Sequence, residues 1–148
     1  MKGYYEDPDA TAEASRFGWH HTGDVGCFDQ DGFFYIVDRV KDMIISGGFN
    51  IFPSEIERVL FTHSAVEDCA VIGIPDDKWG ERIHAVVQPK ANSRASVEEL
   101  MDLCRQRLGG MKAPKSIEFR AELPRSPIGK TLKRALRDEY WAGRTRKV

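Results

Sequence analysis

Hydrophobic and aromatic positions in the first third of the chain follow a strand-like pattern. The apolar runs Val25–Phe28 and Phe33–Val37 flank the polar cluster Asp29–Gly32. An Asp/Gly cluster between two β-rich runs is typical of a β-hairpin, in which Gly32 supplies a positive φ. The sequence therefore predicts a hairpin over residues 25–37.

Farther along the chain, strand-like runs alternate with helical spacing. Short apolar runs predict strands at Ala70–Ile74, Arg82–Gln88 and Ile117–Phe119. Strands that alternate with helices indicate an α+β domain. We expect a small three-stranded sheet that is covered by helices and preceded by the hairpin.

Capping residues mark where the helices of this domain are expected to begin. The predicted caps are Pro53 with the capping box Ser54 and Glu57, then the capping box Ser96 and Glu99, and finally Thr131. Helical spacing turns one set of side chains inward in each helix: Ile56, Val59 and Leu60; Val97, Leu100, Met101, Cys104 and Leu108; Leu132, Ala135 and Leu136.

Composition is that of an ordinary small globular protein. The chain has 148 residues, 41% hydrophobic and 30% charged, with a net charge of −1, which gives no electrostatic reason to expect a nucleic-acid partner. No run approaches the ~20 apolar residues of a membrane span. Arg144–Lys147 is interpreted as a frayed basic tail.

Cysteine and histidine usage indicates neither a disulfide framework nor a metal site. Cys27, Cys69 and Cys104 are far apart and odd in number, which favours reduced thiols in a cytoplasmic protein, the latter two in the core. His20 and His21 are adjacent, and no acidic or cysteine partner recurs at ligand spacing. We expect no bound metal on these residues and assign the histidines structural or hydrogen-bonding roles.

The segment Pro124–Thr131 presents Lys130 at the expected start of the last helix. An ammonium group beside the positive end of a helix dipole is unfavourable unless an anion satisfies both. Lysine suits a phosphate or carboxylate oxygen as a point charge. The ending Gly129-Lys130-Thr131 imitates a P-loop, but that motif requires glycine where Pro124 stands. Taken alone, the segment is equally well interpreted as a turn before an amphipathic helix.

Two other stretches carry candidate chemistry. The Asp24 carboxylate, at the end of Thr22–Asp24, could accept two hydroxyl groups of a ribose, although a strand-capping Asx turn is the simpler interpretation. Asp38–Asp42 holds four charges in five residues and is a place for the chain to bend between two bodies. Ser46–Gly48 interrupts a strand pattern, as glycines do at bulges or where a ligand approaches the backbone.

In order and spacing, these motifs resemble the last signature blocks of the adenylate-forming enzymes, which include acyl-CoA synthetases, luciferases and the adenylation domains of peptide synthetases. The matching stretches are Gly3–Thr11, Thr22–Asp24, Asp38–Asp42, Ser46–Glu57 and Pro124–Lys130. The resemblance covers Gly3 to about Leu136. It implies that residues 1–38 are the tail of a large N-terminal domain and residues 39–148 a C-terminal lid domain. We therefore expect the chain to be a C-terminal piece, cut or expressed separately.

For the first half-reaction of such an enzyme, the resemblance implies three site residues. A carboxylate attacks the α-phosphate of Mg²⁺-bound ATP and forms an acyl-adenylate and pyrophosphate. The resemblance makes Lys130 the catalytic residue that bridges carboxylate and α-phosphate, Asp24 the acceptor of the ribose hydroxyls, and Arg39 a contact to ribose and phosphate. Most ATP and Mg²⁺ contacts would lie in the N-terminal domain.

For the second half-reaction, the resemblance implies a rotation of the lid domain about a hinge at Lys41. A thiol, usually that of the co-substrate CoA, then displaces AMP. Gly47 and Gly48 would line the pantetheine tunnel, where the absent side chains let a thiol pass close to the backbone. Trp79 is either a contact to CoA or a half-buried loop anchor.

The resemblance thus implies an AMP-forming acyl-CoA synthetase for a fatty or aryl acid, in which the isolated fragment is inactive. Its partners would be its own N-terminal domain, the substrates, and a lysine acetyltransferase and deacetylase that act on Lys130. Two alternatives remain: an adenylation enzyme that loads a carrier protein, and a detached lid that serves as a non-catalytic interaction module. Which acid is activated cannot be read, because the acyl pocket would lie in the absent domain.

Overall fold

The structure is a computed structural model that describes residues 1–144. The chain divides into two compact units, Met1–Lys41 and Asp42–Val148, and each is described by itself. The division lies close to the expected one between residues 38 and 39. Of the basic tail expected at Arg144–Lys147, the part from residue 145 onward lies outside the described residues.

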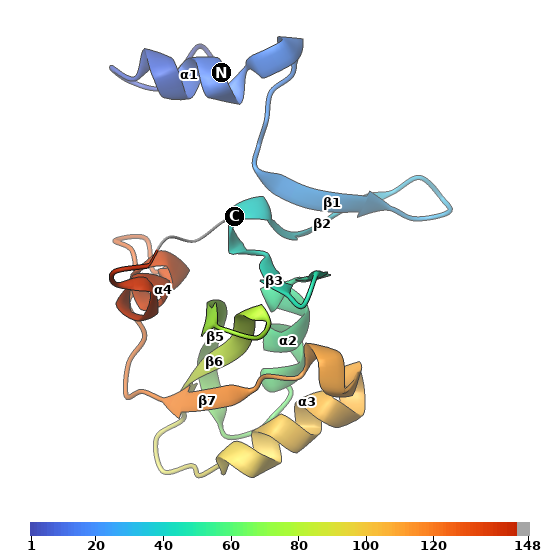
Figure 1. The fold of residues 1–148 in the computed structure, drawn as a ribbon, viewed down its shortest axis with the longest axis vertical. Coiled ribbons are helices and arrows are strands. Elements are labelled where there is room, and N and C mark those ends of the chain that lie inside the picture. Colours follow the sequence, from blue (N-terminus) through green and yellow to red (C-terminus); the bar gives the residue numbers. More distant parts are fainter. Residues whose placement is uncertain (145–148) are drawn as a thin grey trace. The chain divides into compact units, whose positions relative to one another are not determined.

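The first unit contains the predicted hairpin. Its elements are α1 (Pro8–Ala14), η1 (Arg16–Gly18), β1 (Asp24–Phe28) and β2 (Phe34–Arg39). β1 and β2 pair antiparallel, and Gly32 in their connection has a φ of 85°, which confirms both expectations (Figure 1). The Asp29 carboxylate closes this connection by accepting the N–H groups of Asp31 and Phe33 and the hydroxyl of Tyr35. These bonds, the one from Phe33 foremost, lower the pKa of Asp29.

The second unit is an α+β domain, as predicted, with a sheet of five strands. In chain order its elements are η2 (Val40–Asp42, across the boundary), β3 (Ile44–Ser46), β4 (Phe49–Ile51), α2 (Pro53–Leu60), β5 (Val66–Asp76), β6 (Gly80–Pro89), α3 (Val97–Lys112), β7 (Ser116–Phe119) and α4 (Lys133–Trp141). The strand order is β4-β3-β6-β5, and β7 pairs parallel with β6. The three expected strands are β5, β6 and β7, and the short hairpin β3–β4 enlarges the sheet that they form.

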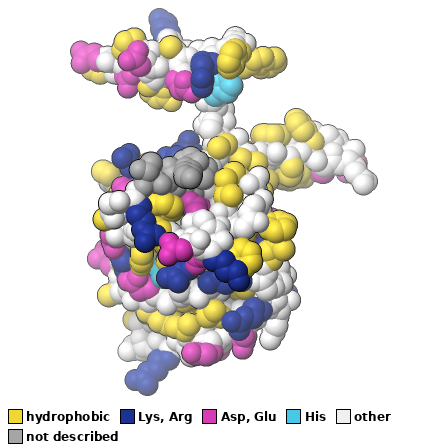
Figure 2. Space-filling view, viewed as in Figure 1, with side chains coloured by type: hydrophobic (Ala, Val, Ile, Leu, Met, Phe, Trp, Pro, Cys, Tyr) yellow, Lys and Arg dark blue, Asp and Glu magenta, His cyan; other side chains and the backbone are white. Residues whose placement is uncertain are grey.

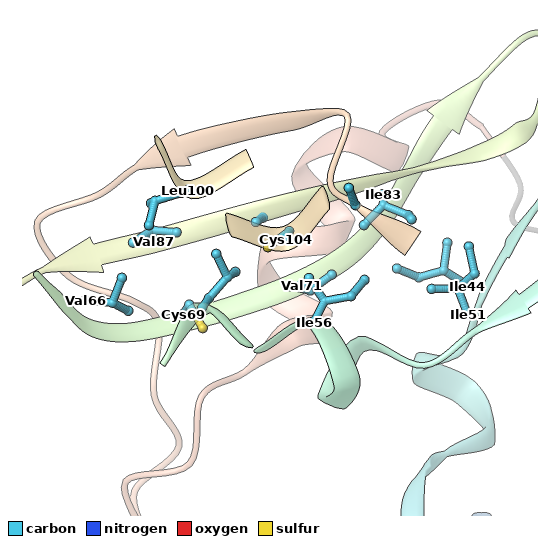
Figure 3. Packing of buried hydrophobic residues seen from close by; sticks show 13 residues of the cluster. Ile44, Ile51, Ile56, Val66, Cys69, Val71, Ile83, Val87, Leu100 and Cys104 are labelled. Carbon is cyan, nitrogen blue, oxygen red and sulfur yellow. The ribbon is translucent and has the colours of Figure 1, made fainter. Parts of the chain in front are cut away.

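Buried residues lie on both faces of the sheet, because successive side chains of β5 point to opposite sides. α2 and α3 cover the face that holds Cys69 and Val71, and Cys104 of α3 joins this cluster (Figure 3). α4 covers the face that holds Ile72, and Leu136 of α4 joins that cluster. Cys69 and Cys104 are core residues, as predicted. Burial raises the pKa of both thiols, that of Cys104 to about 11.

Two of the predicted helix caps are wrong. In each, a side chain of the predicted cap binds a residue far away in the sequence: Glu57 in the first, and Thr131, which binds Asp68, in the second. α2 begins at Pro53, as expected, but no side chain caps it. Glu57 instead accepts the N–H of Val71 at 2.7 Å and pairs with Lys133 at 2.7 Å. Thr131 does not cap α4, which begins at Lys133.

The N-cap of α3 and part of each expected inward face are present. Ser96 Oγ accepts the N–H of Glu99 at 3.0 Å, which confirms this start. The other half of the predicted capping box is missing, because the Glu99 carboxylate lies 3.0 Å from His63 Nε2 instead. In α4, however, Leu136 is buried, whereas Leu132 and Ala135, which we expected to point inward, are exposed. The partly buried positions on α4 are Lys133, Arg137, Tyr140 and Trp141. Side chains with polar groups thus form much of the face that we expected to be apolar: Lys133 and Arg137 pair with Glu57 and Asp42, and Tyr140 and Trp141 form hydrogen bonds to the sheet.

Candidate functional site

Asp24 and Arg39, both expected to contact a ribose, lie opposite each other in the hairpin of the first unit. They are register partners at the open end of β1 and β2, and Arg39 Nε lies 3.2 Å from Asp24 Oδ1. Gly23, with a φ of 76°, accepts the N–H of Val40 at 2.9 Å and turns the chain into this position. The carboxylate is 28% exposed and its Oδ2 has no hydrogen-bond partner within residues 1–144. An oxygen in this state can accept hydroxyl groups from a ligand.

Lys41, the predicted hinge, is the last residue of the first unit. The next residue, Asp42, belongs to the second unit and is anchored there, because its carboxylate lies 3.4 Å from the Arg137 guanidinium of α4. Both side chains of this ion pair are largely buried, 15% and 12% exposed. Lys41 therefore directly precedes a residue that the second unit holds in place.

Gly47 and Gly48 form the two-residue turn that joins β3 and β4. Their φ values are 59° and 84°, and Ser46 pairs with Phe49 across the turn. A two-residue hairpin turn with positive φ at both positions is the type that strongly favours glycine. The expected interruption of a strand at these glycines is thus the turn of a hairpin.

The two glycines have different surroundings. A Cβ atom on Gly47 would lie 2.6 Å from Cε3 of Trp79, whereas a Cβ atom on Gly48 would meet nothing within 4 Å. The N–H of Gly47 also donates to the Trp79 carbonyl at 2.9 Å. Only Gly48 therefore borders open space.

Trp79 lies in the connection between β5 and β6 and is 48% exposed. Asp76 holds this connection by accepting the N–H groups of Lys78 and Trp79, and the Lys78 ammonium lies 4.9 Å from the centre of the indole ring. The indole also lines a mainly apolar pocket of about 290 Å³. The other lining residues are Ser46, Phe49, Ile51, Met111 and Lys115.

Lys130 is an exposed residue in a closely hydrogen-bonded turn. Ser126 N donates to the Lys130 carbonyl at 2.8 Å, and Lys130 N donates to Ser126 Oγ at 3.1 Å. Gly129, with a φ of 80°, donates its N–H to the Ser126 carbonyl and accepts from Arg125 Nη1 at 3.1 Å. The backbone at Lys130 is thus fixed, whereas its ammonium has no carboxylate partner among the described residues.

The expectation that Lys130 stands at the mouth of a helix is wrong. α4 begins at Lys133, after Leu132, and Lys130 belongs to a separate turn that the bridge between Arg125 and Thr131 closes. A helix dipole acts mainly within the first turn of its own helix. The start of α4 therefore adds little positive field at Lys130, and the positive charge there is that of its own ammonium.

Two residues that brace the Lys130 turn were not identified from the sequence. Asp68 of β5 accepts from Arg125 Nη2 at 2.6 Å and from Thr131 Oγ1 at 3.1 Å. Arg125 lies within the motif that carries Lys130, but Asp68 is 57 residues away from it along the chain. The only local signal is that Asp68 directly precedes the buried run of β5 that begins at Cys69, which does not show what the carboxylate binds.

The remaining sequence expectations concern metal ligands, the histidine pair and membrane spans. Within residues 1–144, no group of three or more His, Cys, Asp and Glu side chains could hold a metal ion. His21 Nε2 lies 3.0 Å from the Arg16 carbonyl, which confirms a hydrogen-bonding role for this histidine. In the described part of the chain, no helix combines the length and apolar character that a membrane crossing requires.

A model of the AMP-binding enzyme C-terminal domain family matches residues 55–130. The chain belongs to this family. The feruloyl-CoA synthase of an Amycolatopsis species is 53% identical over 140 residues, which are 95% of this chain and 28% of that protein. The long-chain-fatty-acid–CoA ligase of Bacillus subtilis (strain 168) is 48% identical over 139 residues, 94% of this chain and 25% of that protein. The chain thus spans about a quarter of the length of these relatives.

Solved structures share the fold of this AMP-binding enzyme C-terminal domain. The o-succinylbenzoate CoA synthetase of Bacillus subtilis, in complex with its acyl-adenylate intermediate, superimposes with a TM-score of 0.85 at 40% identity, over 93% of this chain and 28% of that one. A fatty acyl CoA synthetase of Mycobacterium tuberculosis superimposes with a TM-score of 0.71 at 44% identity, over 97% and 28%. These matches confirm both the α+β fold and the resemblance to adenylate-forming enzymes.

Proposed function

We propose that this chain is the C-terminal part of an AMP-forming acyl-CoA synthetase. The whole enzyme would activate a carboxylic acid with ATP to an acyl-adenylate, release pyrophosphate, and transfer the acyl group to CoA with release of AMP. The observation that carries the proposal is the exposed, carboxylate-free ammonium of Lys130 on a fixed backbone. The names of the similar proteins, a feruloyl-CoA synthase and a long-chain-fatty-acid–CoA ligase, support an aryl or fatty acid as the substrate class.

In the first half-reaction, Lys130 would stabilise charge in the transition state. The acid and the α-phosphate are both anionic, so positive charge must lie where their oxygens approach. Because the Lys130 ammonium is not neutralised by a neighbouring carboxylate among the described residues, its full charge is available to the substrates. A braced backbone lowers the reorganisation that accompanies the reaction, which is how preorganised charges accelerate chemistry.

Asp24 and Arg39 would hold the ribose of ATP. The free oxygen of the Asp24 carboxylate can accept the ribose hydroxyls while its other oxygen stays paired with Arg39. The Arg39 guanidinium is half-exposed and has N–H groups to spare for ribose or phosphate oxygens. The pairing of these two residues across the hairpin supports one shared role.

The second half-reaction would use Lys41, Gly47, Gly48 and Trp79. We propose Lys41 as the hinge because the boundary between the two compact units follows it directly. Rotation about this hinge would remove Lys130 from the adenylate and bring the Gly47–Gly48 turn to the incoming thiol. The open space at Gly48 and the apolar pocket beside Trp79 support a path for the pantetheine arm of CoA.

The remaining partners belong to the same proposal. ATP with Mg²⁺ would be bound mainly by an N-terminal domain, for which the hairpin offers an apolar surface (Figure 2). Five large hydrophobic side chains are exposed there: Phe28, Phe33, Phe34, Tyr35 and Ile36. A surface of this kind marks a binding site for another protein part. The exposed Lys130 also suits a lysine acetyltransferase and deacetylase of the cytoplasm, and acetylation would remove its charge.

Replacement of Lys130 tests the proposal. In a full-length ligase that contains this chain, Lys130→Ala should slow acid-dependent pyrophosphate release by roughly 10²–10³-fold, the scale for one preorganised stabiliser of charge. Thioester formation from preformed acyl-adenylate should change far less, because Lys130 has no role in that step. Lys90→Ala, at an exposed lysine without a side-chain partner among the described residues, is the matched control. Adenylation that survives Lys130→Ala within a few-fold would contradict the assignment.

A further inference from the structure

The Lys130 turn is attached to the sheet through one carboxylate. Asp68 of β5 is 15% exposed, and its Oδ2 accepts both Arg125 Nη2 at 2.6 Å and Thr131 Oγ1 at 3.1 Å. Its other oxygen accepts the N–H of Cys69 at 2.8 Å, which fixes the orientation of the carboxylate on its own strand. Three donors therefore satisfy a single side chain that bridges the sheet and the turn.

The bonds to Asp68 hold the two residues at which the turn begins and ends, Arg125 and Thr131. Arg125 and Thr131 are bridge partners, and Leu132 N donates to the Pro124 carbonyl at 2.7 Å just below them. Asp68 holds one member of this bridge by an ion pair and the other by a hydroxyl. The residues above the bridge, from 126 to 130, are closed by their own hydrogen bonds. The turn can thus move as a unit only if the bonds to Asp68 break.

The bond to Thr131 fixes the residue that directly follows Lys130. The Thr131 hydroxyl is directed at Asp68, whereas the Lys130 side chain beside it is exposed. Arg125 adds a second constraint, since its guanidinium reaches both Asp68 Oδ2 and the Gly129 carbonyl.

We propose that Asp68 is a positioning residue for Lys130, one that aims the ammonium by holding Arg125 and Thr131. Asp68 needs no contact with substrate for this role. The inference rests on the proposed function of Lys130 in adenylation. According to this proposal, the rate of adenylation depends on a carboxylate that does not contact the reacting atoms.

The kinetic test combines variants of Asp68 and Lys130 in a full-length ligase that contains this chain. Asp68→Asn, which keeps the shape but loses the charge, should lower kcat for adenylation by on the order of 10–100-fold, the scale of a displaced catalytic group. KM for ATP and the rate of thioester formation from preformed adenylate should stay unchanged. In a Lys130→Ala background, Asp68→Asn should cause no further loss. Thr131→Val, which removes only one donor, should show a smaller effect of the same kind.

A second measurement, amide hydrogen exchange, tests the stability of the turn independently of catalysis. In the 148-residue chain, Asp68→Asn should speed amide hydrogen exchange at Ser126, Gly129 and Leu132 roughly tenfold, the scale of one charge-assisted hydrogen bond. The control is Glu67→Ala: this neighbouring carboxylate is exposed and has no partner among the described residues. Glu67→Ala should leave both the exchange and adenylation unchanged.

The outcomes separate the two proposals. Wild-type adenylation in Asp68→Asn and Thr131→Val, or an undiminished loss from Asp68→Asn when Lys130 is already alanine, overturns the positioning role alone. Adenylation that persists in Lys130→Ala overturns the proposed function and the positioning role with it. A loss in Asp68→Asn that disappears in the Lys130→Ala background supports both.

Discussion

At the scale of single residues, the ammonium of Lys130 illustrates how a surface lysine becomes available for chemistry. Ion pairs with carboxylates neutralise other cations of this chain, among them Lys112 and Lys133. The Asp68 carboxylate, which binds the Lys130 turn, accepts its hydrogen bonds there from Arg125 and Thr131. The charge on Lys130 therefore remains for a ligand.

Lysine and arginine should not be interchangeable at position 130. We expect Lys130→Arg to remain as slow in adenylation as Lys130→Ala, because a planar guanidinium cannot replace a compact ammonium in a tight site. Pyrophosphate release in single-turnover experiments on the full-length ligase measures this. Substantial recovery by arginine would show that only a diffuse positive charge is needed, and would weaken the proposed bridging role.

Gly48 should matter more for thioester formation than for adenylation. In Gly48→Leu, the new side chain would enter the open space beside the turn, where we propose that pantetheine passes. Gly48→Ala is the matched control, because it carries the same strain of positive φ without the branched side chain. The two half-reactions, measured separately, should show a loss confined to thioester formation in Gly48→Leu and absent from Gly48→Ala. Equal losses in both half-reactions would indicate a purely conformational role.

Gly47 should instead act through stability. A Cβ atom at this position would lie 2.6 Å from the Trp79 ring and 2.9 Å from its next carbon, so the indole must move. We expect Gly47→Ala to lower the free energy of unfolding by about 1–3 kcal/mol, the usual cost of overpacking, and by more than Gly48→Ala does. Denaturant titration of the two variants makes the comparison, and equal losses would contradict it.

At the scale of elements, a polar network joins β6, β7 and α4 inside the second unit. His84 Nδ1 lies 2.8 Å from Ser116 Oγ, and His84 Nε2 lies 3.0 Å from the Tyr140 hydroxyl. Tyr140 donates its single proton to Glu118, so it accepts from His84 Nε2–H, and Nδ1 accepts from Ser116. The neutral imidazole is therefore fully hydrogen-bonded in one tautomer.

This network should make the chain less stable in mild acid. Burial lowers the pKa of His84 below 6.5, with Arg82 and Arg120 acting in the same direction and Glu118 opposing them. Below pH 6.5 the unfolded chain then binds more protons at His84 than the native chain, so the free energy of unfolding falls as pH decreases.

Denaturant titrations at about pH 7.5 and about pH 5.5, on either side of the ordinary titration range of histidine, measure this fall. His84→Gln should reduce the difference between the two values, whatever its effect on the stability at neutral pH. His20→Gln is the control, because His20 is exposed and has no side-chain partner within residues 1–144. An unchanged difference in His84→Gln would contradict the assignment.

Local patterns predicted those elements whose determinants are local. The hairpin over residues 25–37, the strands β5, β6 and β7 and the cap at Ser96 all follow from neighbouring residues. The hairpin β3–β4 was missed because each strand has only three residues, although Gly-Gly between two β-rich runs is itself a hairpin signal. The caps at Ser54 and Thr131 failed because Glu57 and Thr131 bind partners on β5 that sequence spacing cannot reveal.

The candidate site likewise contains residues that local motifs predict and one residue that they do not. Lys130, Asp24 and Arg39 could be named because they lie in motifs, and the pairing of Asp24 with Arg39 follows from the hairpin register. Asp68 could not be named, since its relation to the Lys130 turn depends on how residues 124–132 pack on β5. Contacts between distant segments are fixed by packing, and a single sequence does not contain them explicitly.

At the scale of the whole molecule, the two compact units have very different cores. The second unit contains both buried clusters, which run from Ile44 to Leu136. In the first unit Ala14 is the one hydrophobic residue that is buried among residues 1–41, whereas the hairpin exposes several aromatic side chains. A unit with so little buried apolar surface gains little free energy from its own packing.

The 148-residue chain should therefore fold in its second unit and yet catalyse nothing. Cooperative unfolding by near-ultraviolet circular dichroism should report the core formed by β5, β6 and the helices that cover them. Carboxylate-dependent pyrophosphate release should stay at the level of a Lys130→Ala control, because the chain spans about a quarter of its relatives and offers ATP only the few contacts proposed for Asp24, Arg39 and Lys130. Measurable release above that control, or thioester formation with CoA, would show that these residues suffice for catalysis and would overturn the proposed dependence on an N-terminal domain.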